Sequence, residues 1–310
     1  MRILVLGAGG IGGYFGARMQ AAGGDVTFLV RPARAAQLRA SGLKVFSACG
    51  DLQVTPEVLT RDELRAPFDV IIVSCKAYDL DSAMDAIGPA IGEHSVILPL
   101  LNGVLHIDTL ATRFGSQRVL GGVALISAML SPNGEIRHLN KFHRLIAGSR
   151  NAQPSPWLQP LTELFSKSAF DFTLSDNIEQ AMWDKMVFLS SLAAATCTLR
   201  ASIGVILNTV AGEGYITGLI AECARVAEAS GHAVAEAQLA AYRNQLTEKG
   251  SALVASMLRD VERGGATEAD HILGDLVGRA QTKGVDAPWL RLAYAHLQAY
   301  ELRRKSGAAI

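Results

Sequence analysis

The chain has 310 residues, of which 49% are hydrophobic and 19% charged, and its 29 basic residues balance its 29 acidic ones. This composition is typical of globular domains, and the length favours two domains over one. A net charge of zero argues against a nucleic-acid-binding protein and against an anionic membrane as partner. The longest apolar stretch, residues 186–199, is too short to span a bilayer. The four cysteines match no metal-ligand spacing, and no signal-peptide pattern precedes the first predicted strand. We therefore expect a cytoplasmic protein without a metal site.

The first predicted strand runs directly into a glycine-rich turn. Residues 3–6 form an apolar run typical of a strand buried on both faces, and a helical stretch follows from Ile11 to about Ala22. The turn reads G-x-G-x-x-G and consists of Gly7, Ala8, Gly9, Gly10, Ile11 and Gly12. At a strand-to-helix junction this pattern indicates a dinucleotide site, with the pyrophosphate at the helix N-terminus. The alternative is a glycine-rich turn in another kind of α/β domain, because the chain has 30 glycines.

The end of the second predicted strand, residues 25–30, indicates which nicotinamide cofactor fits. An acidic residue there would bind the ribose 2′-hydroxyl of NAD, whereas an arginine accommodates the 2′-phosphate of NADP. Arg31 and Arg34 follow this strand, and no acidic residue lies between them. The sequence therefore predicts NADP(H) as cofactor. The alternative is that both arginines are ordinary solvated surface residues.

Two further strand ends bring polar side chains to the same edge of the predicted sheet. Lys76 follows the strand at 68–74, and Asn102 follows the strand at 95–100. Ligands of open parallel sheets bind outside the carboxyl ends of the strands. Lys76 could therefore meet a phosphate or a substrate anion, and the Asn102 amide could lie near the nicotinamide. An Asn-Gly pair is also typical of a plain turn.

The rest of the chain divides into a mixed region and a helical region. Residues 33–41 suggest a helix, residues 43–59 extended structure, and residues 119–148 antiparallel strands that extend the parallel sheet. A helix at 156–168 and a strand at 170–174 complete the mixed region. Asp176 and Glu179 match a capping box, so we place the domain boundary there. Apolar residues at three- and four-residue steps then predict helices at 177–199, 212–230, 234–249, 267–283 and 289–305.

The predicted fold class is therefore α/β: a Rossmann-type dinucleotide-binding domain at residues 1–176, followed by an all-α domain at residues 177–310. The chain also resembles the ketopantoate (2-dehydropantoate) reductase family over essentially its whole length. The similarity rests on the order and spacing of the glycine turn, Arg31, Cys75–Tyr78, Asn102–Gly103, Met182–Lys185, Ala255–Asp260, Thr267–Glu268 and Asp270. The resemblance implies an NADPH-dependent reductase with its active site in the cleft between the two domains.

The resemblance also implies roles for individual residues. Lys185 matches the catalytic lysine of the family and Glu268 its carboxylate partner. Asn102 and Ser256 match substrate-contacting positions, and Lys76 matches a lysine near cofactor and substrate. The chemistry is consistent, because the alkoxide formed from a carbonyl needs a proton donor, and a glutamate keeps a desolvated ammonium charged. Taken alone, Lys185 would be a helix-surface lysine beside Trp183, and Glu268 a glutamate that complements a helix dipole.

Three positions depart from the family pattern. Leu189, Ala193 and Ile203 stand where the family has substrate-contacting asparagines, and helical spacing puts the first two on the face of Lys185. Polar pockets discriminate strongly between substrates with and without a hydroxyl group. The loss of three amides leaves ketopantoate itself open as substrate. We consider Arg200 as a substitute carboxylate anchor, with Ser190 and Ser191 as weaker candidates.

Several functions remain open on the sequence alone. The leading one is NADPH-dependent reduction of a small-molecule 2-oxo acid, either by a ketopantoate reductase, which would place it in pantothenate biosynthesis, or by a relative with a less polar substrate. A non-catalytic NADP-sensing protein would need neither Lys185 nor Glu268. An opine or hydroxy acid dehydrogenase built on the same plan would be expected to share only the N-terminal turn. The oligomeric state, a homodimer included, also stays open.

Overall fold

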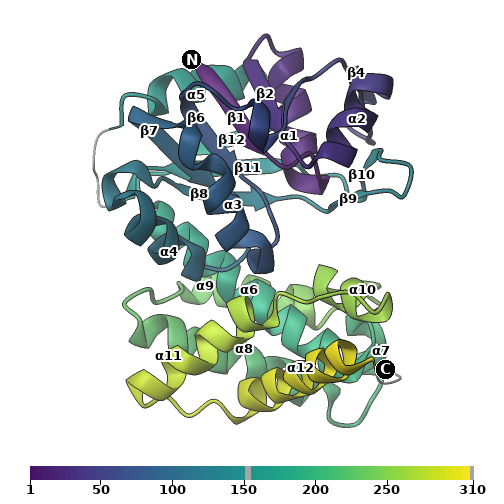
Figure 1. Cartoon of the computed structure of the whole chain (residues 1–310). Helices are drawn as coiled ribbons and strands as arrows, with labels where there is room; N and C mark the ends of the chain where they lie inside the picture. Colours follow the sequence, from purple (N-terminus) through teal and green to yellow (C-terminus); the bar gives the residue numbers. More distant parts are fainter. Residues whose placement is uncertain (151–154, 308–310) are drawn as a thin grey trace. The chain divides into compact units, whose positions relative to one another are not determined.

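The protein is described by a computed structural model, which covers residues 1–150 and 155–307. The chain forms two compact units (Figure 1). The first contains residues 1–101 and 106–181, and the second contains residues 102–105 and the chain from 182 onward. The helix α6 (Ile178–Leu199) runs through the division between the two units. Within the described ranges, no helix is long and apolar enough to cross a membrane.

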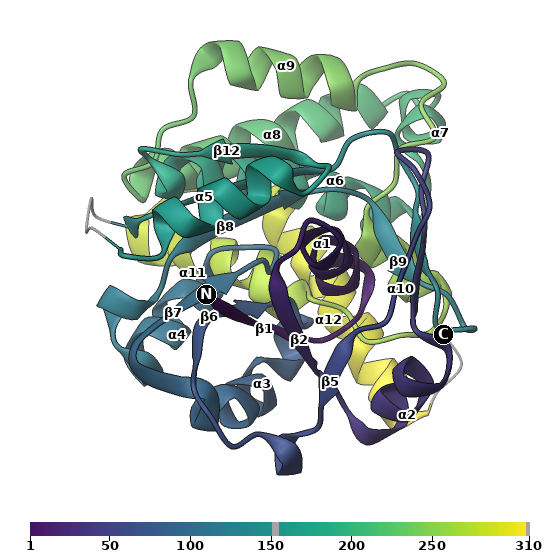
Figure 2. The ribbon, with the colours of Figure 1, turned by 90° about the horizontal axis from the view of Figure 1, so that it is seen from above.

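The first unit is built on a parallel sheet with the strand order β5-β2-β1-β6-β7. Its strands are β1 (Arg2–Leu6), β2 (Asp25–Leu29), β5 (Glu57–Leu59), β6 (Phe68–Val73) and β7 (Ile91–Pro99). The central strand β1 pairs with β2 on one side and β6 on the other, and its residues 3–6 are buried, as its apolar run predicts. Helices α1 (Gly10–Ala21) and α3 (Leu80–Ile87) cover opposite faces of this sheet (Figure 2). This arrangement confirms the predicted Rossmann-type α/β class.

The remaining helices of this unit are α2 (Pro32–Ser41), α4 (Leu105–Phe114) and α5 (Leu158–Lys167). Its remaining strands form two further sheets. One has the order β4-β3-β10-β9 and the other the order β12-β11-β8. Their bounds are β3 (Leu43–Phe46), β4 (Leu52–Val54), β8 (Gly121–Leu125), β9 (Ala128–Leu130), β10 (Ile136–His138), β11 (Arg144–Gly148) and β12 (Asp171–Leu174).

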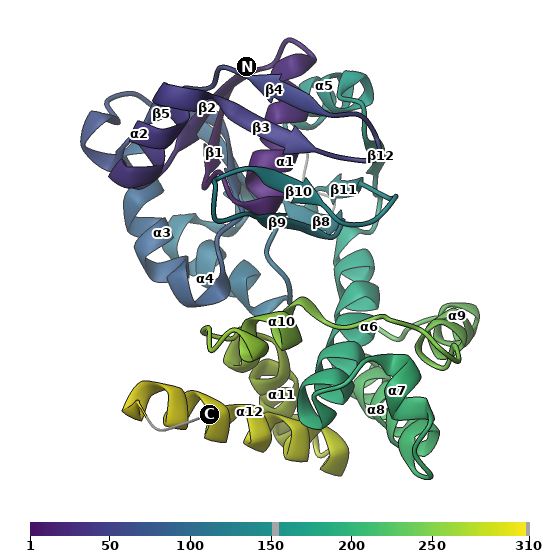
Figure 3. The ribbon, with the colours of Figure 1, turned by 90° about the vertical axis from the view of Figure 1, so that its right-hand side faces the viewer.

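The expectation that residues 119–148 form antiparallel strands that extend the parallel sheet is right only in part, because Val119 makes a parallel β-bridge with Ile97 of β7 but the strands after it form sheets of their own. The antiparallel pairs β9–β10 and β8–β11 do form, but they belong to the two separate sheets. The physical reason is that α1 is buried along most of its length and needs a second cover. The β4-β3-β10-β9 sheet packs on α1 (Figure 3), so closely that a Cβ on Gly10 would lie 2.6 Å from the Ala128 carbonyl oxygen.

The second unit is helical, and it confirms the predicted all-α region. Its helices are α6, α7 (Ile203–Leu207), α8 (Gly212–Ala229), α9 (Glu236–Leu246), α10 (Ser256–Glu262), α11 (Asp275–Lys283) and α12 (Pro288–Ser306). The short helices α7 and α10 were not predicted. The segment predicted as one helix from residue 267 instead contains a π-helical turn, Asp270–Gly274, before α11.

The predicted capping box at the start of α6 is also wrong. The backbone N–H of Gln180 donates to Asn177 Oδ1 over 3.2 Å, so Asn177 caps the helix. Glu179 accepts a hydrogen bond from Arg150 Nε at 3.0 Å. Helix α6 begins at Ile178, whose buried side chain would contact a Cβ on Gly121 at 2.6 Å. This packing fixes the helix start one residue beyond the position that an Asp176 cap requires.

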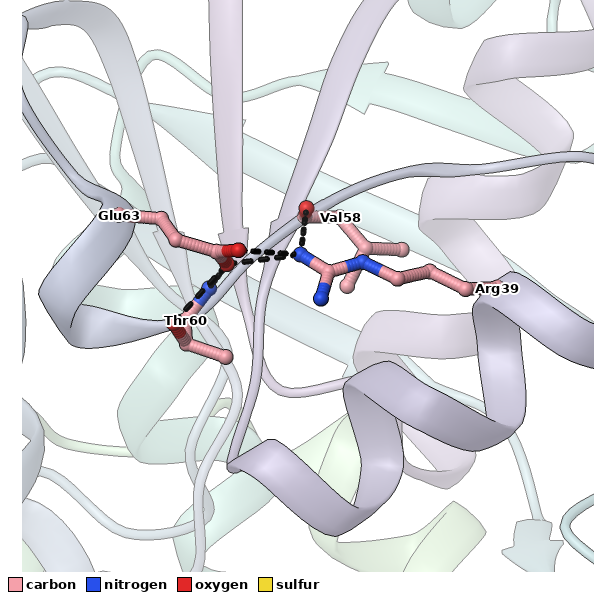
Figure 4. A network of polar contacts seen from close by, with 4 residues as sticks. All are labelled: Arg39, Val58, Thr60 and Glu63. Atoms are coloured by element: carbon pink, nitrogen blue, oxygen red, sulfur yellow. Dashed lines mark hydrogen bonds and ion pairs between the residues drawn. The ribbon is translucent and has the colours of Figure 1, made fainter.

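An exposed polar network ties α2 to the end of β5 (Figure 4). The backbone N–H and the hydroxyl of Thr60 donate to Glu63 Oε2 at 2.7 and 2.9 Å. Arg39 Nη2 donates to both Glu63 oxygens at 2.8 and 2.7 Å and to the Val58 carbonyl at 3.1 Å. The Thr60 backbone bond and then the Arg39 bond lower the pKa of Glu63 to about 2.

Glu63→Gln tests this network because it keeps the shape and removes the charge. The folded-state pKa of Glu63 lies below its ordinary value of 4.5, so the carboxylate stabilises the fold above that pH, and the contribution is lost as the pH falls toward 2. We expect a higher melting temperature for wild type than for Glu63→Gln at pH 7, and a difference that shrinks steadily below pH 4.5. Circular dichroism melts across this range measure it. A difference that does not change with pH would contradict the prediction.

Candidate active site

The glycine turn after β1 has the backbone geometry of a dinucleotide site. Gly7 has a φ of +91° and donates its N–H to the Leu29 carbonyl at 2.9 Å, so it makes the tight turn. A Cβ on Gly12 would overlap Ser74 Oγ and lie 2.5 Å from the Gly7 carbonyl oxygen, so this glycine permits close helix–strand packing. A Cβ on Gly9 would meet no atom within 4 Å. Gly9 therefore faces open space, which fits the close approach of a pyrophosphate group to the backbone.

Arg34 holds this turn in place. Its Nη2 donates to the Ala8 carbonyl at 3.0 Å, and its Nη1 donates to the Gly134 carbonyl at 2.8 Å and to Gln37 Oε1 at 2.6 Å. Burial lowers the pKa of the guanidinium. The turn continues through Ile11 into the first turn of α1. Arg34 thus ties the glycine turn to the β9–β10 hairpin.

Arg31 has a different environment, although it lies only three residues earlier. Its side chain is 79% exposed, and its Nη2 donates to Asp79 Oδ1 at 3.0 Å. Asp79 closes the short turn Ala77–Asp79 that follows β6, and Lys76 precedes this turn. The structure therefore brings Arg31, Lys76 and the glycine turn to the carboxyl edge of one sheet.

The second unit brings Lys185 and Asn102 into contact. Lys185 Nζ donates to Asn102 Oδ1 at 3.0 Å. Burial lowers the pKa of Lys185 to about 8, and the charge of Glu268 opposes this shift. The Glu268 side chain belongs to the buried set, with 6% of the residue exposed. Three residues singled out in the sequence, Asn102, Lys185 and Glu268, thus form one cluster. In it the Asn102 amide oxygen accepts a hydrogen bond from the partly desolvated ammonium of Lys185, and the charge of Glu268 stabilises that ammonium.

The side chain of Trp183 lies in a different environment from that of Lys185. The indole stacks on His232, with ring centroids 5.1 Å apart and planes 14° apart, and the guanidinium of Arg279 lies 5.2 Å from its centre. Residues two positions apart on a helix point in nearly opposite directions. Lys185 therefore leaves α6 on a different face from Trp183, toward Asn102.

His271 is a member of this cluster that sequence reasoning missed. It lies in the π-helical turn, a form of helix that is often found at functional sites. A Cβ on Gly103 would lie 3.0 Å from the His271 ring. Burial lowers the pKa of His271, while the charge of Glu268 and a hydrogen bond to the Asn102 backbone raise it. The only signal in the sequence is that His271 stands three residues after Glu268, which alone predicts no role.

A second group lies further along α6. The N–H of Ala255, the residue before Ser256, donates to Thr196 Oγ1 at 3.4 Å, and Thr196 lies about one helical turn beyond Ala193. Ile203 donates its N–H to the Leu253 carbonyl at 3.0 Å, so it also lies near the start of α10. Ala193 and Ile203 are fully buried, whereas Leu189 is half-buried. Ala193 follows Lys185 by eight residues, which is about 12 Å along the helix axis.

The structure does not bring the suggested substitute anchors to Lys185. Arg200 follows the last residue of α6 with a φ of +48°, fifteen positions and about 22 Å of helix from Lys185. Ser191 Oγ donates to the Val187 carbonyl at 2.8 Å, and Ser190 Oγ lies 3.5 Å from Met186 Sδ. Both serines are fully buried, and the Ser191 hydroxyl also bonds with the thiol of Cys223 on α8.

A Rossmann-type unit with a glycine turn, followed by a helical unit with a buried lysine, asparagine and glutamate, defines the class of dinucleotide-binding oxidoreductases. Within that class the chain belongs to the ketopantoate reductase family. Residues 3–151 match the model of ketopantoate reductase PanE/ApbA, and residues 177–301 match the model of its C-terminal part. The family resemblance deduced from the motifs is thereby confirmed.

The similar proteins include an uncharacterized oxidoreductase and proteins named 2-dehydropantoate 2-reductase. The chain is 37% identical over 304 residues to the uncharacterized oxidoreductase YkpB of Bacillus subtilis (strain 168), covering 98% of this chain and 100% of YkpB. It is 28% identical over 295 residues to a 2-dehydropantoate 2-reductase of Halobacterium salinarum, covering 94% and 96% of the two chains. The crystal structure of a 2-dehydropantoate 2-reductase from Geobacter metallireducens GS-15 has a TM-score of 0.88 and 28% identity, covering 96% and 99%.

Glu268→Gln tests whether the cluster is electrostatically coupled. The substitution removes the charge that raises the pKa of Lys185, so we expect this pKa to fall below about 8. Titration by ¹³C NMR of protein labelled at lysine Cε measures it, with the signal assigned by its loss in Lys185→Arg. Glu262→Gln, an exposed change on α10, is the control and should leave the signal unchanged. An unaltered Lys185 pKa in Glu268→Gln would show that the two groups do not interact.

Proposed function

We propose that the chain is an NADPH-dependent reductase that converts a 2-oxo acid to the 2-hydroxy acid, with Lys185 as proton donor. The observation that carries the proposal is the ammonium of Lys185, hydrogen-bonded to Asn102 with a pKa of about 8. When bound, the nicotinamide cofactor supplies a hydride to the carbonyl carbon. The oxygen then needs a proton or a positive charge, and an ammonium provides both.

The surroundings of Lys185 suit this task. A pKa of about 8 leaves the amine mostly protonated at pH 7 and makes the proton easier to release than that of a solvated lysine. Glu268 limits the fall of the pKa, so the charged form is retained. The Asn102 amide oxygen accepts one of the three N–H donors and thereby orients the ammonium. Asn102 and Ser256 are our candidates for contacts with the substrate.

The residues of the cofactor site support NADPH. The pyrophosphate would approach the backbone at Gly9, in the turn that Gly7 and Gly12 shape, and Arg31 would bind the 2′-phosphate, with Lys76 at the same sheet edge. Arginine binds phosphate through charge-assisted, often bidentate hydrogen bonds. Arg34 would contribute indirectly, through its bond to Ala8.

The three positions that depart from the family's asparagines favour a 2-oxo acid less polar than ketopantoate. Ala193 and Ile203 are buried and Leu189 is half-buried, and none of the three side chains can hydrogen-bond. Two compared proteins are named 2-dehydropantoate 2-reductases, so ketopantoate is the first substrate to test, and pantothenate biosynthesis would follow from a positive result. Arg200 lies too far along α6 to be retained as a carboxylate anchor beside Lys185.

The cofactor preference is tested by Arg31→Ala. Loss of a charge-assisted bond to the 2′-phosphate should raise the Michaelis constant for NADPH by about tenfold or more. The constant for NADH should change much less, because NADH has no phosphate there, and it serves as internal control. Steady-state kinetics with both cofactors measure the effect. Equal use of NADPH and NADH by the wild-type protein would contradict this assignment of Arg31.

The proton donor is tested by Lys185→Ala. Turnover should fall by about a hundredfold or more, because general acid catalysis is lost. Binding of NADPH, followed by its fluorescence, should be nearly unchanged. In the wild-type protein only the protonated amine is active, so kcat/KM should fall as the pH rises through about 8. Undiminished turnover in Lys185→Ala would remove this residue from the mechanism.

The substrate pocket is tested with ketopantoate and trimethylpyruvate, which differ only in one hydroxyl group. A hydroxyl desolvated without a partner costs about 1–3 kcal/mol, so we expect kcat/KM to favour trimethylpyruvate by about tenfold. Leu189→Asn should shift the ratio toward ketopantoate, while the control Leu189→Ala should not. Adding Ala193→Asn should increase the shift, but it buries an amide, so its folding is checked by circular dichroism. Efficient reduction of ketopantoate by the wild-type protein would refute the apolar pocket.

A further inference from the structure

The ion pair between Arg31 and Asp79 joins the ends of two strands that are not neighbours. Arg31 follows β2 and Asp79 follows β6, and β1 lies between them in the sheet. Two strand spacings amount to about 10 Å. With Arg31 Nη2 and Asp79 Oδ1 3.0 Å apart, the pair reaches across the end of β1, where Gly7 begins the glycine turn.

This position matters for the cofactor. In a fold of this kind the pyrophosphate lies at the start of the helix after β1, and the adenosine ribose lies at the end of β2. An acidic residue at the end of β2 would select NAD by binding the 2′-hydroxyl, and this chain has none there. The pair shows that a carboxylate from the turn after β6 is nevertheless held 3.0 Å from the guanidinium of Arg31.

The carboxylate of Asp79 has opposite effects on the two cofactors. It competes with a 2′-phosphate for the Arg31 guanidinium and repels the phosphate charge. It can accept a hydrogen bond from the 2′-hydroxyl of NADH. The Arg31 side chain is 79% exposed and the Asp79 side chain 36% exposed, so the pair itself is weak and opens at little cost. Asp79 therefore changes cofactor choice without blocking the site.

We propose that Asp79 is a specificity-determining residue that reduces the preference of this protein for NADPH over NADH. The proposal rests on the proposed role of Arg31 at the 2′-phosphate. It assigns to the turn after β6 a part of the selectivity that is normally expected at the end of β2.

The test measures dissociation constants for NADPH and NADH, by cofactor fluorescence, in wild type, Asp79→Asn, Arg31→Ala and the double variant. Asp79→Asn should bind NADPH about three- to tenfold more tightly and NADH more weakly. In the Arg31→Ala background the gain for NADPH should be smaller, because the competition for the guanidinium is gone. Asp85→Asn is the matched control: it removes the same charge from the exposed pair with Arg113, which is 3.1 Å long with both side chains 57% exposed.

The outcomes separate this inference from the proposed function. If Arg31→Ala weakens NADPH binding but Asp79→Asn leaves the ratio of the two constants unchanged, only the inference is overturned. Weaker NADPH binding in Asp79→Asn also overturns it, because the carboxylate would then merely hold Arg31 in place. An equal shift in Asp85→Asn would show a general charge effect and overturn it as well. If Arg31→Ala has no effect on NADPH, the proposed cofactor site itself is wrong.

Discussion

The candidate site of the helical unit depends on the partial burial of one ammonium group, that of Lys185. Burial disfavours the charged form, and the folded-state pKa of about 8 lies below the ordinary 10.5. The unfolded chain therefore binds the Lys185 proton more tightly than the folded chain does, so this residue lowers the stability of the fold at neutral pH. The destabilisation disappears as the pH rises from about 8 to 10.5. Because the buried ammonium of Lys185 opposes folding, other contacts must hold the residues around it in place. Such a conflict is typical of sites kept for chemistry.

Two sets of contacts hold those neighbours. On α6, the hydroxyl of Tyr242 donates to the Asp184 carbonyl at 2.8 Å, next to Lys185. The Glu268 segment is fixed by α12: Glu301 accepts the Thr267 N–H at 2.6 Å, and Tyr294 donates to Asp270 Oδ1 at 2.8 Å. The carboxylate thus lies between two anchored residues. The position of Glu268 is therefore determined by a helix that carries none of the proposed catalytic residues.

The sequence was most informative where one local rule decides the structure. Buried parallel strands must be apolar, a left-handed turn favours glycine, and a long helix shows its period, so β1, Gly7 and α6 could all be predicted. The sequence was least informative where packing between segments far apart in the chain determines the structure. Nothing local shows that β9 and β10 cover α1, or that the packing of Ile178 moves the start of α6.

The candidate site shows the same division. The order and spacing of the family motifs identified Lys185, Asn102 and Glu268 as candidate site residues, because several such motifs in the family's order seldom occur together by chance. His271 could not be found, since its relevance depends on contact with the turn at Gly103 and not on its neighbours in sequence. Arg200 looked close to Lys185 in the sequence, but the rise of the helix separates them by about 22 Å.

Arg31 and Arg34 show that residue type alone does not determine whether an arginine is available to bind a phosphate. Both follow β2 on α2 or its cap, and the sequence offered Arg31 first and Arg34 second as partners of a 2′-phosphate. Main-chain carbonyls of Ala8 and Gly134 occupy the guanidinium of Arg34, and these bonds are short and partly buried. The guanidinium of Arg31 instead meets the exposed carboxylate of Asp79, which a phosphate can displace. The proposed cofactor choice thus depends on which arginine is already bonded within the fold, while the proposed proton transfer depends on an ammonium whose burial lowers the stability of the fold.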